Sequence, residues 1–479
     1  MRPSQSTMYS RFAASDPAWD GRFFTGVLTT GIYCLPSCKA RKPKRENVRF
    51  FPTCDAARAS GFRACLKCHP DDFARGADPV VESIEALVAE IRADPARFRD
   101  VKAVVKRSGF GTTRCFELFR QHFHSTPADV LLRSRINAAR RLLVSGTMAL
   151  ADVSAAAGFE SLSVFHEHFK ALNGMTPAAY RGLRSAGEFT VELPEAYPLG
   201  RLLRSLGRDP QSVTERLTGS TYETSADFNG VPGIMTLRFS AKGAAVGVWV
   251  REGVKSEHRV AAHRLVVGML GLDQDAAAFA RLARRLGLGR LVAGRHGLRL
   301  IRTPSLWDAI LWSIVGQQIN LPFACVLKRR VIENTGIPLK DGLYSLPSPA
   351  AVSRLTPQDM RPWQYSRQKA EYLIGAARLI AEDKLDLAAL PLMSATRAER
   401  TLLNVRGLGP WSVNYVMMRS LGFADCVPFG DTGVTSGLKK LFELEERPDI
   451  DGTRRLMAVF SPHRSLATAH LWQINQPDA

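Results

Sequence analysis

The stretch LLNVRGLGPW, residues 402–411, places a Gly-x-Gly sequence between two segments with helical patterns. This arrangement predicts a tight hairpin between two helices. Such a hairpin exposes backbone N–H groups, which can bind a phosphate without the help of a side chain. We therefore expect Gly407 and Gly409 to contact DNA. Because many proteins use the same hairpin only to hold DNA, the hairpin alone does not predict an enzyme.

An acidic residue, Asp431, follows the hairpin after an aromatic residue and a predicted helix. This order resembles the helix-hairpin-helix DNA glycosylases, above all DNA-3-methyladenine glycosylase II, the AlkA type. The resemblance covers residues 188–479. Its further motifs are WDAI at 307–310, GQQI at 316–319 and HLW at 470–472.

The resemblance implies a role for five residues of the C-terminal part. Asp431 is the catalytic carboxylate, and Trp411, Tyr415 and Trp472 line the base pocket. Gln318 takes the place of the side chain that fills the gap left by the flipped nucleotide. Some members of the family carry an aliphatic wedge at this place, and Gly430 stands where some have a second acid.

The chemistry of these residue types suits the excision of alkylated bases. A base must leave the stack before its glycosidic bond can break. Alkylation makes a purine cationic, and aromatic rings attract cations. An anion such as Asp431 can stabilise the cationic sugar that develops. Because no lysine lies between the hairpin and Asp431, we expect a monofunctional enzyme without lyase activity. Alternatively, the three aromatic residues could simply pack in the core, and Asp431 could be only a helix cap.

The sequence on either side of Pro304 predicts two kinds of structure. The runs 233–239 and 244–250 alternate apolar with small or polar residues, as strands do. Beyond Pro304, apolar residues recur at helical spacing, from Trp307 to Val315. We therefore expect a β-rich subdomain at 188–302 and an all-α domain at 303–479. The AlkA-type resemblance implies that the first is like the TATA-binding protein and that the second is a helix-hairpin-helix domain.

An internal repeat marks the segment 79–185. Three pairs recur in order: Gly109-Phe110 as Gly158-Phe159, Phe119-Arg120 as Phe169-Lys170, and Thr126-Pro127 as Thr176-Pro177. The second copy, with Ser161 as a helix cap, resembles the AraC-type helix-turn-helix, which implies two recognition helices in successive major grooves. The candidates for base contact are Thr113, Arg114, Glu117, Ser163 and Glu167. The alternative is two helical hairpins that pack on each other.

Two close cysteine pairs, Cys34-x3-Cys38 and Cys65-x2-Cys68, mark residues 1–76. Two chelating turns of this kind can place four thiolates about 2.3 Å from one Zn²⁺, which would also stabilise a small core. Two disulfides are the alternative, although a reducing compartment disfavours them. Cys54 is expected to be a buried thiol.

The sequence around these cysteines, above all TTGIYCLPSCKAR at 29–41 and GFRACLKC at 61–68, resembles the zinc domain of the Ada adaptive-response family. The resemblance implies that Cys34 is both a zinc ligand and the acceptor of a methyl group from a DNA methylphosphotriester. The basic run Lys39–Arg45 follows directly, and Arg41 and Arg45 are candidates for phosphate contact. A solvated basic loop is the alternative. The Pro-Cys-His-Arg motif of an alkylguanine methyltransferase is absent from the sequence.

Composition supports a nucleic-acid partner. The 479 residues include 65 Lys and Arg against 45 Asp and Glu, which gives a net charge of +20. No long apolar stretch predicts a membrane span, and the N-terminus does not read as a signal peptide. We therefore expect a bacterial cytoplasmic, nucleoid-associated protein without a membrane partner.

Together these features predict a multidomain α+β protein with a zinc-bound α/β head, a tandem helix-turn-helix, a β-rich subdomain and a helix-hairpin-helix glycosylase. It would excise alkylated bases such as 3-methyladenine from double-stranded DNA. Methyl transfer to Cys34 would switch on alkylation-response genes through promoter DNA and RNA polymerase. The alternatives are a regulator that binds alkylated bases without cutting them, and a metal sensor, which a closed four-cysteine site disfavours.

Overall fold

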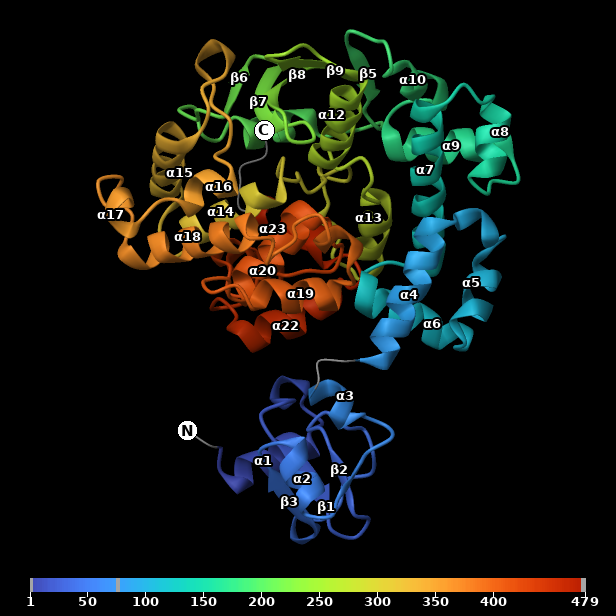
Figure 1. Cartoon of the computed structure of the whole chain (residues 1–479), viewed down its shortest axis with the longest axis vertical. Coiled ribbons are helices and arrows are strands. Elements are labelled where there is room, and N and C mark those ends of the chain that lie inside the picture. The colour runs from blue at the N-terminus through green and yellow to red at the C-terminus, as the bar shows by residue number, and fades with distance from the viewer. Residues whose placement is uncertain (1–2, 75–77, 475–479) are drawn as a thin grey trace. The chain divides into compact units, whose positions relative to one another are not determined.

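The computed structural model describes residues 3–74 and 78–474, which form two compact units, Met1–Val88 and Ala89–Ala479 (Figure 1). The boundary between the units falls within α4 (Pro79–Ala93). The first expected domain border involves residues 75–77, which lie outside the described residues, and the division into four domains stays a prediction. Within the described part of the chain, no helix is long and apolar enough to span a membrane.

The first unit is built on a small mixed sheet with the order β3-β1-β2-β4. Strand β1 runs antiparallel to β2 and β3, and β2 runs parallel to β4. Gly26 lies in β1 because a Cβ there would come within 2.7 Å of the Phe51 ring. The elements are α1 (Gln5–Ala13), β1 (Phe24–Val27), β2 (Ile32–Cys34), β3 (Val48–Phe51), α2 (Cys54–Ala59), β4 (Arg63–Ala64) and α3 (Pro70–Ala74).

The second unit begins with the predicted repeat, which the structure folds into two short helical pairs on one long helix. Each copy turns at its glycine, which has a positive φ of 72° at Gly109 and 89° at Gly158. Ser161 caps its helix as expected and accepts a hydrogen bond from Val164 N. The helices are α5 (Val101–Ser108), α6 (Thr112–Phe123), α7 (Pro127–Ser145), α8 (Leu150–Ala156), α9 (Leu162–Asn173) and α10 (Pro177–Gly182).

A five-stranded antiparallel sheet follows, with the order β5-β9-β8-β7-β6. The alternating runs predicted as strands lie in β8 and β9, and α12 packs against β9. The elements are β5 (Phe189–Glu192), α11 (Leu199–Leu206), β6 (Glu215–Thr218), β7 (Thr221–Asp227), β8 (Pro232–Ser240), β9 (Gly243–Val250), α12 (Ser256–Met269) and α13 (Ala276–Arg285).

The rest of the second unit is helical and contains the predicted hairpin between α19 and α20. A π-helical turn, η7 (Met417–Leu421), continues α20. The helices are α14 (Leu306–Val315), α15 (Leu321–Thr335), α16 (Pro349–Ser353), α17 (Pro357–Met360), α18 (Arg367–Ala381), α19 (Ala395–Leu403), α20 (Pro410–Val416), α21 (Thr432–Leu441), α22 (Ile450–Ala458) and α23 (Arg464–Gln473). The expected multidomain α+β class is therefore confirmed.

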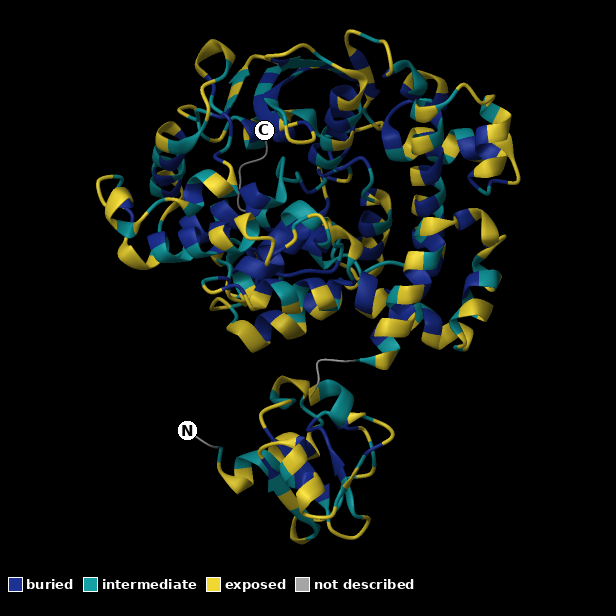
Figure 2. Cartoon of the chain, in the orientation of Figure 1, coloured by how far each residue is buried: buried dark blue, intermediate teal, exposed yellow. Residues whose placement is uncertain are grey.

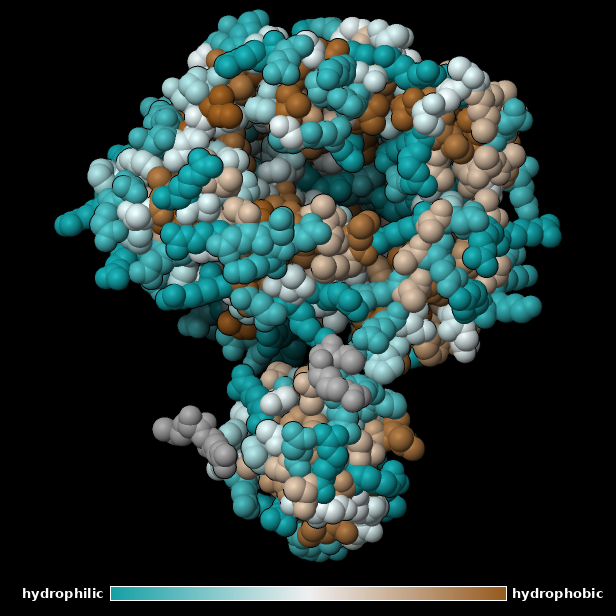
Figure 3. All heavy atoms as spheres, viewed as in Figure 1, coloured by the Kyte–Doolittle hydropathy of each residue, from teal (hydrophilic) through white to brown (hydrophobic). Residues whose placement is uncertain are grey.

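The helix-turn-helix part and the sheet share one hydrophobic core. Buried residues from Ile136 to Leu183 pack together with those from Phe189 to Leu272 (Figure 2). Two further cores lie in the helical part, one around α14 and α18 and one around α21 and α23. Hydrophilic residues cover most of the visible surface (Figure 3).

The first helix-turn-helix copy also contacts the helical part of the chain that contains the hairpin. His122 Nδ1 lies 2.8 Å from Thr396 Oγ1, at the beginning of α19. His124 Nδ1 accepts a hydrogen bond of 3.3 Å from Asp425 N, in the segment that leads to Asp431. Burial lowers the pKa of His124 to about 4, so the ring is neutral at this contact at neutral pH.

Candidate zinc centre and base-excision cleft

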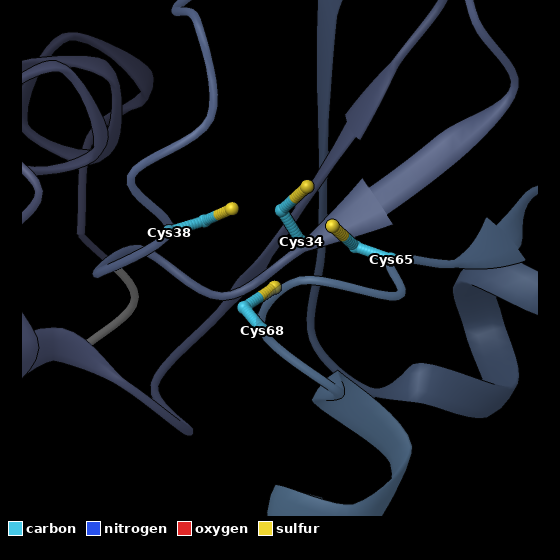
Figure 4. Close-up of side chains that lie close together, drawn as sticks. All are labelled: Cys34, Cys38, Cys65 and Cys68. Carbon is cyan, nitrogen blue, oxygen red and sulfur yellow. The ribbon is translucent and has the colours of Figure 1, made fainter. Parts of the chain in front are cut away.

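The four predicted cysteines converge in the first unit (Figure 4). Their Sγ atoms all lie within 4.8 Å of one another, and three of the side chains are buried while Cys68 is half-buried. Cys34 ends β2, Cys38 lies in the next turn, and the second pair follows β4. Four sulfur donors so close together fit a tetrahedral Zn²⁺. The cluster holds one Zn²⁺, as expected from the spacing.

The sulfur of Cys34 differs from the other three in its hydrogen bonds. Those three accept backbone N–H groups: Cys38 from Ala40, Cys65 from Lys67 at 3.4 Å, and Cys68 from Leu35 at 3.4 Å. No such donor to Cys34 is present among the described residues. A thiolate without N–H donors keeps more of its charge on sulfur, so this difference favours Cys34 as the nucleophile. Its role stays a prediction.

The basic run beside the site is anchored at one lysine. Lys42 Nζ donates to the carbonyl of Cys38 and lies 4.1 Å from the centre of the Phe12 ring. Burial lowers the pKa of Lys42. Arg41 and Arg45 are exposed, so their side chains are accessible to a phosphate. Cys54 is buried, as expected, and donates to the carbonyl of Pro70.

The recognition helices expose the residues proposed to read bases. The candidates Thr113, Arg114, Glu117, Ser163 and Glu167 all lie on exposed positions of α6 and α9. The opposite face of each helix is buried, with Phe119 and Phe169 in the cores. The exposure leaves these side chains available to a major groove, and their contacts with bases stay a prediction.

A cleft of about 1860 Å³ opens in the second unit between the sheet and the helices. All the predicted residues of the enzyme line it: Trp411, Tyr415, Trp472, Asp431, Gln318, Gly407 and Gly409. The rings of Trp411 and Tyr415 stack with centroids 5.5 Å apart and planes 16° apart. A flipped base that entered this cleft would therefore meet aromatic rings beside a carboxylate.

The carboxylate of Asp431 is held by three N–H donors. Trp472 Nε1 donates to Oδ1 at 2.9 Å, and Trp411 Nε1 donates to Oδ2 at 3.2 Å. Val434 N also donates to Oδ1, because Asp431 is the N-cap of α21. Asp431 is thus both a helix cap and a cleft residue, so the two readings of the sequence are compatible. The cap fixes the carboxylate at the cleft wall.

The hairpin has the tight geometry that its glycines predict. Gly407 has a φ of 96°, and a Cβ there would lie 2.4 Å from Cγ of Tyr372. Gln317, which the sequence reading did not assign a role, donates from Nε2 to the carbonyl of Gly407 at 2.8 Å and to Ser412 Oγ at 3.1 Å. In the sequence, only its position directly before Gln318 could have indicated a role for Gln317.

Gln318 occupies a left-handed backbone conformation with a φ of 55°. Non-glycine residues rarely adopt this conformation, and they concentrate at functional sites. The neighbouring Gln317 anchors the turn to the hairpin, so Gln318 extends from a fixed loop beside the cleft. This placement is consistent with a side chain that fills the space of a flipped nucleotide.

Three known domain families match the chain in the order that the motifs predict. The metal binding domain of Ada matches residues 7–71, a helix-turn-helix domain matches 104–182, and the HhH-GPD superfamily of base excision DNA repair proteins matches 311–462. A DNA-3-methyladenine glycosylase from Bacillus subtilis is 35% identical over 42% of this chain and 68% of that protein. The chain belongs to the DNA-3-methyladenine glycosylase family. It joins this AlkA-type glycosylase to an Ada-type regulator.

A relative that spans both parts supports this fusion, and a solved structure supports the fold of one part. A probable bifunctional transcriptional activator/DNA repair enzyme AlkA from Mycobacterium tuberculosis is 27% identical over 97% of this chain and 95% of that protein. The structure of a 3-methyladenine DNA glycosylase from Archaeoglobus fulgidus matches 60% of this chain and 99% of that one, with a TM-score of 0.53 and 18% identity. The latter supports the fold of the glycosylase part.

Proposed function

We propose that this Ada–AlkA fusion repairs alkylated DNA in two ways. Its glycosylase part hydrolyses the N-glycosidic bond of alkylated bases such as 3-methyladenine in double-stranded DNA. Its zinc domain removes a methyl group from a DNA methylphosphotriester, and the methylated protein activates alkylation-response genes. RNA polymerase as the partner in activation, and the nucleoid of the bacterial cytoplasm as the location, belong to the same proposal.

The observation that carries the glycosylase proposal is the carboxylate of Asp431 within the aromatic cleft. Its oxygens are oriented by the indole N–H groups of Trp411 and Trp472. When the glycosidic bond breaks, its electron pair leaves with the base and the sugar becomes cationic. A fixed carboxylate stabilises this cation, and water then adds to the sugar carbon and loses a proton.

The lysines of the cleft do not favour a Schiff base with the sugar. Lys328 and Lys369 are the lysines among the cleft residues. Lys328 Nζ lies 2.7 Å from Asp308 Oδ1, and this neighbour raises the pKa of Lys328 despite the opposing effect of burial. Lys369 Nζ donates to the carbonyl of Val315 at 2.7 Å. Burial lowers the pKa of Lys369, but both amines are engaged by groups of the chain, so we infer a monofunctional enzyme.

The methyl-transfer proposal assigns the acceptor role to Cys34. Its thiolate attacks the methyl carbon of the phosphotriester, and the C–O bond breaks with its electron pair on the phosphate oxygen. The products are a thioether on Cys34 and an ordinary phosphodiester. Zinc would keep the thiolates deprotonated when bound by the four cysteines. The transfer makes the site one unit less negative, which weakens its repulsion of DNA phosphates.

The glycosylase proposal is tested with Asp431→Asn, which keeps size and shape but removes the charge. Release of 3-methyladenine from methylated DNA should fall by about 10²–10³, as is common when an oriented electrostatic group is lost. DNA binding should survive, because the hairpin is unchanged. Release at the parent rate would show that Asp431 is not the catalytic carboxylate. A parent protein that binds the lesion but releases no base would instead be a regulator.

The methyl-acceptor proposal has an independent test. Cys34→Ser should accept no methyl group, and Cys54→Ser, which changes a buried thiol outside the cluster, should accept one as the parent does. Peptide mass spectrometry locates the methyl group after incubation with a methylphosphotriester oligonucleotide. A methyl group on Cys38, Cys65 or Cys68 of the parent would overturn the assignment.

A further inference from the structure

One helical face carries three aligned side chains into the cleft. Trp411, Tyr415 and Arg419 follow one another at intervals of four residues along α20 and η7. The Trp411 and Tyr415 rings stack, and the guanidinium carbon of Arg419 lies 5.9 Å from the centre of the Tyr415 ring. The aromatic pair therefore continues into a planar cation that also lines the cleft. Arg419 belongs to none of the sets assigned above.

The side chain of Arg419 has few partners. Its Nε is buried without a hydrogen-bond partner, and the Tyr415 hydroxyl is the one hydrogen-bond partner of the guanidinium among the described residues. Arg302 also has a buried, unbonded Nε, but its terminal nitrogen binds the carboxylate of Asp273. Arg419 makes no such ion pair within the described ranges. Its backbone is fixed, since Thr303 N donates to its carbonyl at 2.8 Å.

The charges around Arg419 leave it short of acceptors. The carboxylate of Asp308 acts on it, but Asp308 already contacts Lys328. A second guanidinium, that of Arg208, repels Arg419 because both carry a positive charge. Arg208 also lines the cleft, 5.1 Å from the centre of the Trp312 ring. Arg419 as a whole is half-buried at the cleft wall, and its Nε is buried without an acceptor. Unused donors of this kind favour a ligand that supplies acceptors. The cleft at this end therefore suits a ligand that carries acceptors.

We propose that Arg419 is a specificity-determining residue that reads the atom at position 6 of a flipped purine. This inference rests on the proposed glycosylase function. A 6-oxo purine presents an acceptor oxygen, which the guanidinium can bind. A 6-amino purine presents a donor there and leaves Arg419 unpaired. Arg419 thus favours excision of 6-oxo bases, such as 7-methylguanine, relative to 6-amino bases, such as 3-methyladenine.

A flipped base is a better occupant than a backbone phosphate. The Nε of Arg419 is buried, and the residue continues the row of Trp411 and Tyr415, whose ring faces suit a base. The glycines of the hairpin supply the backbone donors expected for phosphate. Because both 7-methylguanine and 3-methyladenine are cationic within DNA, the repulsion between Arg419 and a cation largely cancels when the two are compared.

The test uses full-length protein and one methylated duplex DNA that contains both lesions. The two released bases are separated and quantified in the same reaction at single turnover. Arg419→Met should lower release of 7-methylguanine about tenfold more than release of 3-methyladenine, the size of one lost base contact. Arg419→Lys keeps the charge but loses the planar fork, and it should give a smaller change of the same sign.

The control variant is Arg454→Met. Arg454 also lines the cleft, but it pairs with Asp451 at 3.1 Å and contacts the Phe429 ring. Its loss should leave the ratio of the two bases unchanged. An equal effect of Arg419→Met on both bases would overturn the inference. A parent protein that releases neither base would instead refute the proposed glycosylase function.

A second measurement needs no variant. Free hypoxanthine and free adenine differ along the edge at positions 1 and 6: hypoxanthine has an acceptor oxygen at position 6 and a proton on N1, whereas adenine has a donor amine at position 6 and an acceptor N1. Each can compete with the lesion for the parent enzyme. Hypoxanthine should inhibit release of 3-methyladenine at a concentration about tenfold lower than adenine does. Equal inhibition, or stronger inhibition by adenine, would overturn the role of Arg419 even if its variants failed to fold.

Discussion

Replacing Trp472 by phenylalanine tests whether the indole donors position the carboxylate of Asp431, the proposed catalytic group. The change removes the N–H that donates to Asp431 Oδ1 at 2.9 Å but keeps an aromatic ring in the cleft. Asp431 would keep its bonds from Val434 N and from Trp411 Nε1. The negative charge would therefore remain, and its orientation would be less constrained.

The expected loss follows from the strength of one hydrogen bond to an ionised group. Such a bond contributes about 1.5–3 kcal/mol. At about 1.4 kcal/mol for each factor of ten in rate, its loss corresponds to about 10- to 100-fold slower bond cleavage. Because two of the three donors remain on Asp431, we expect the lower part of this range.

The assay is release of 3-methyladenine at single turnover, with DNA binding measured in parallel. Trp312→Phe is a matched control, since Trp312 lines the same cleft but makes no hydrogen bond to Asp431 in the described structure. It should change the rate of cleavage less than threefold, as expected for a residue that does not touch the carboxylate. A Trp472→Phe protein that cleaves as fast as the parent would refute the positioning role.

Three other predictions concern the switch, the interface and the hairpin. Methylation of Cys34 should tighten promoter binding at fixed salt, because the zinc site becomes less negative, and equal affinities would contradict this. The pKa of His124 is lowered to about 4, so its contribution to stability should be constant above pH 6.5 and fall as the pH drops from 6.5 to 4, where the unfolded chain binds the proton first; urea unfolding of His124→Gln should therefore show a weaker fall over this range than the parent. Gly407→Ala should lower the melting temperature because its Cβ would clash with Tyr372, whereas Gly409→Ala has open space around its Cβ and should melt like the parent.

Local patterns in the sequence predicted much of the fold. The alternation in 233–239 and 244–250 lies in β8 and β9, and the apolar spacing after Pro304 lies in α14. Ser161 caps α9 because its hydroxyl accepts a hydrogen bond from a backbone N–H three residues away. Each cysteine pair forms one turn. These features depend on residues that are close in the chain, whereas the two pairs converge because β2 and β4 lie side by side.

Contacts between distant segments could not be predicted in this way. The shared core of α7–α10 with the sheet joins residues such as Phe169 and Val246, whose apolar character says nothing about their partners. His124 meets Asp425 across the fold, and only the structure shows that pair. No sequence pattern marks Arg419. Its proposed role depends on a π-helical turn and on the absence of a carboxylate partner among the described residues.

The reading of Asp431 shows a different limit. The sequence offered a catalytic carboxylate and a helix cap as alternatives, and the structure gives the residue both environments. Capping places the side chain at the beginning of α21, and the indoles of Trp411 and Trp472 then orient it in the cleft. A sequence pattern alone does not show that one residue contacts both a neighbour in its own helix and a residue distant in the chain.

One chain is proposed to perform both repair reactions. The most direct measurement incubates the parent protein with methylated duplex DNA and analyses both products of the same mixture. Peptide mass spectrometry should find one methyl group on Cys34, and chromatography should find free 3-methyladenine. A Cys34→Ser protein should still release the base, and an Asp431→Asn protein should still accept the methyl group. Absence of either product from the parent reaction would contradict the corresponding half of the claim.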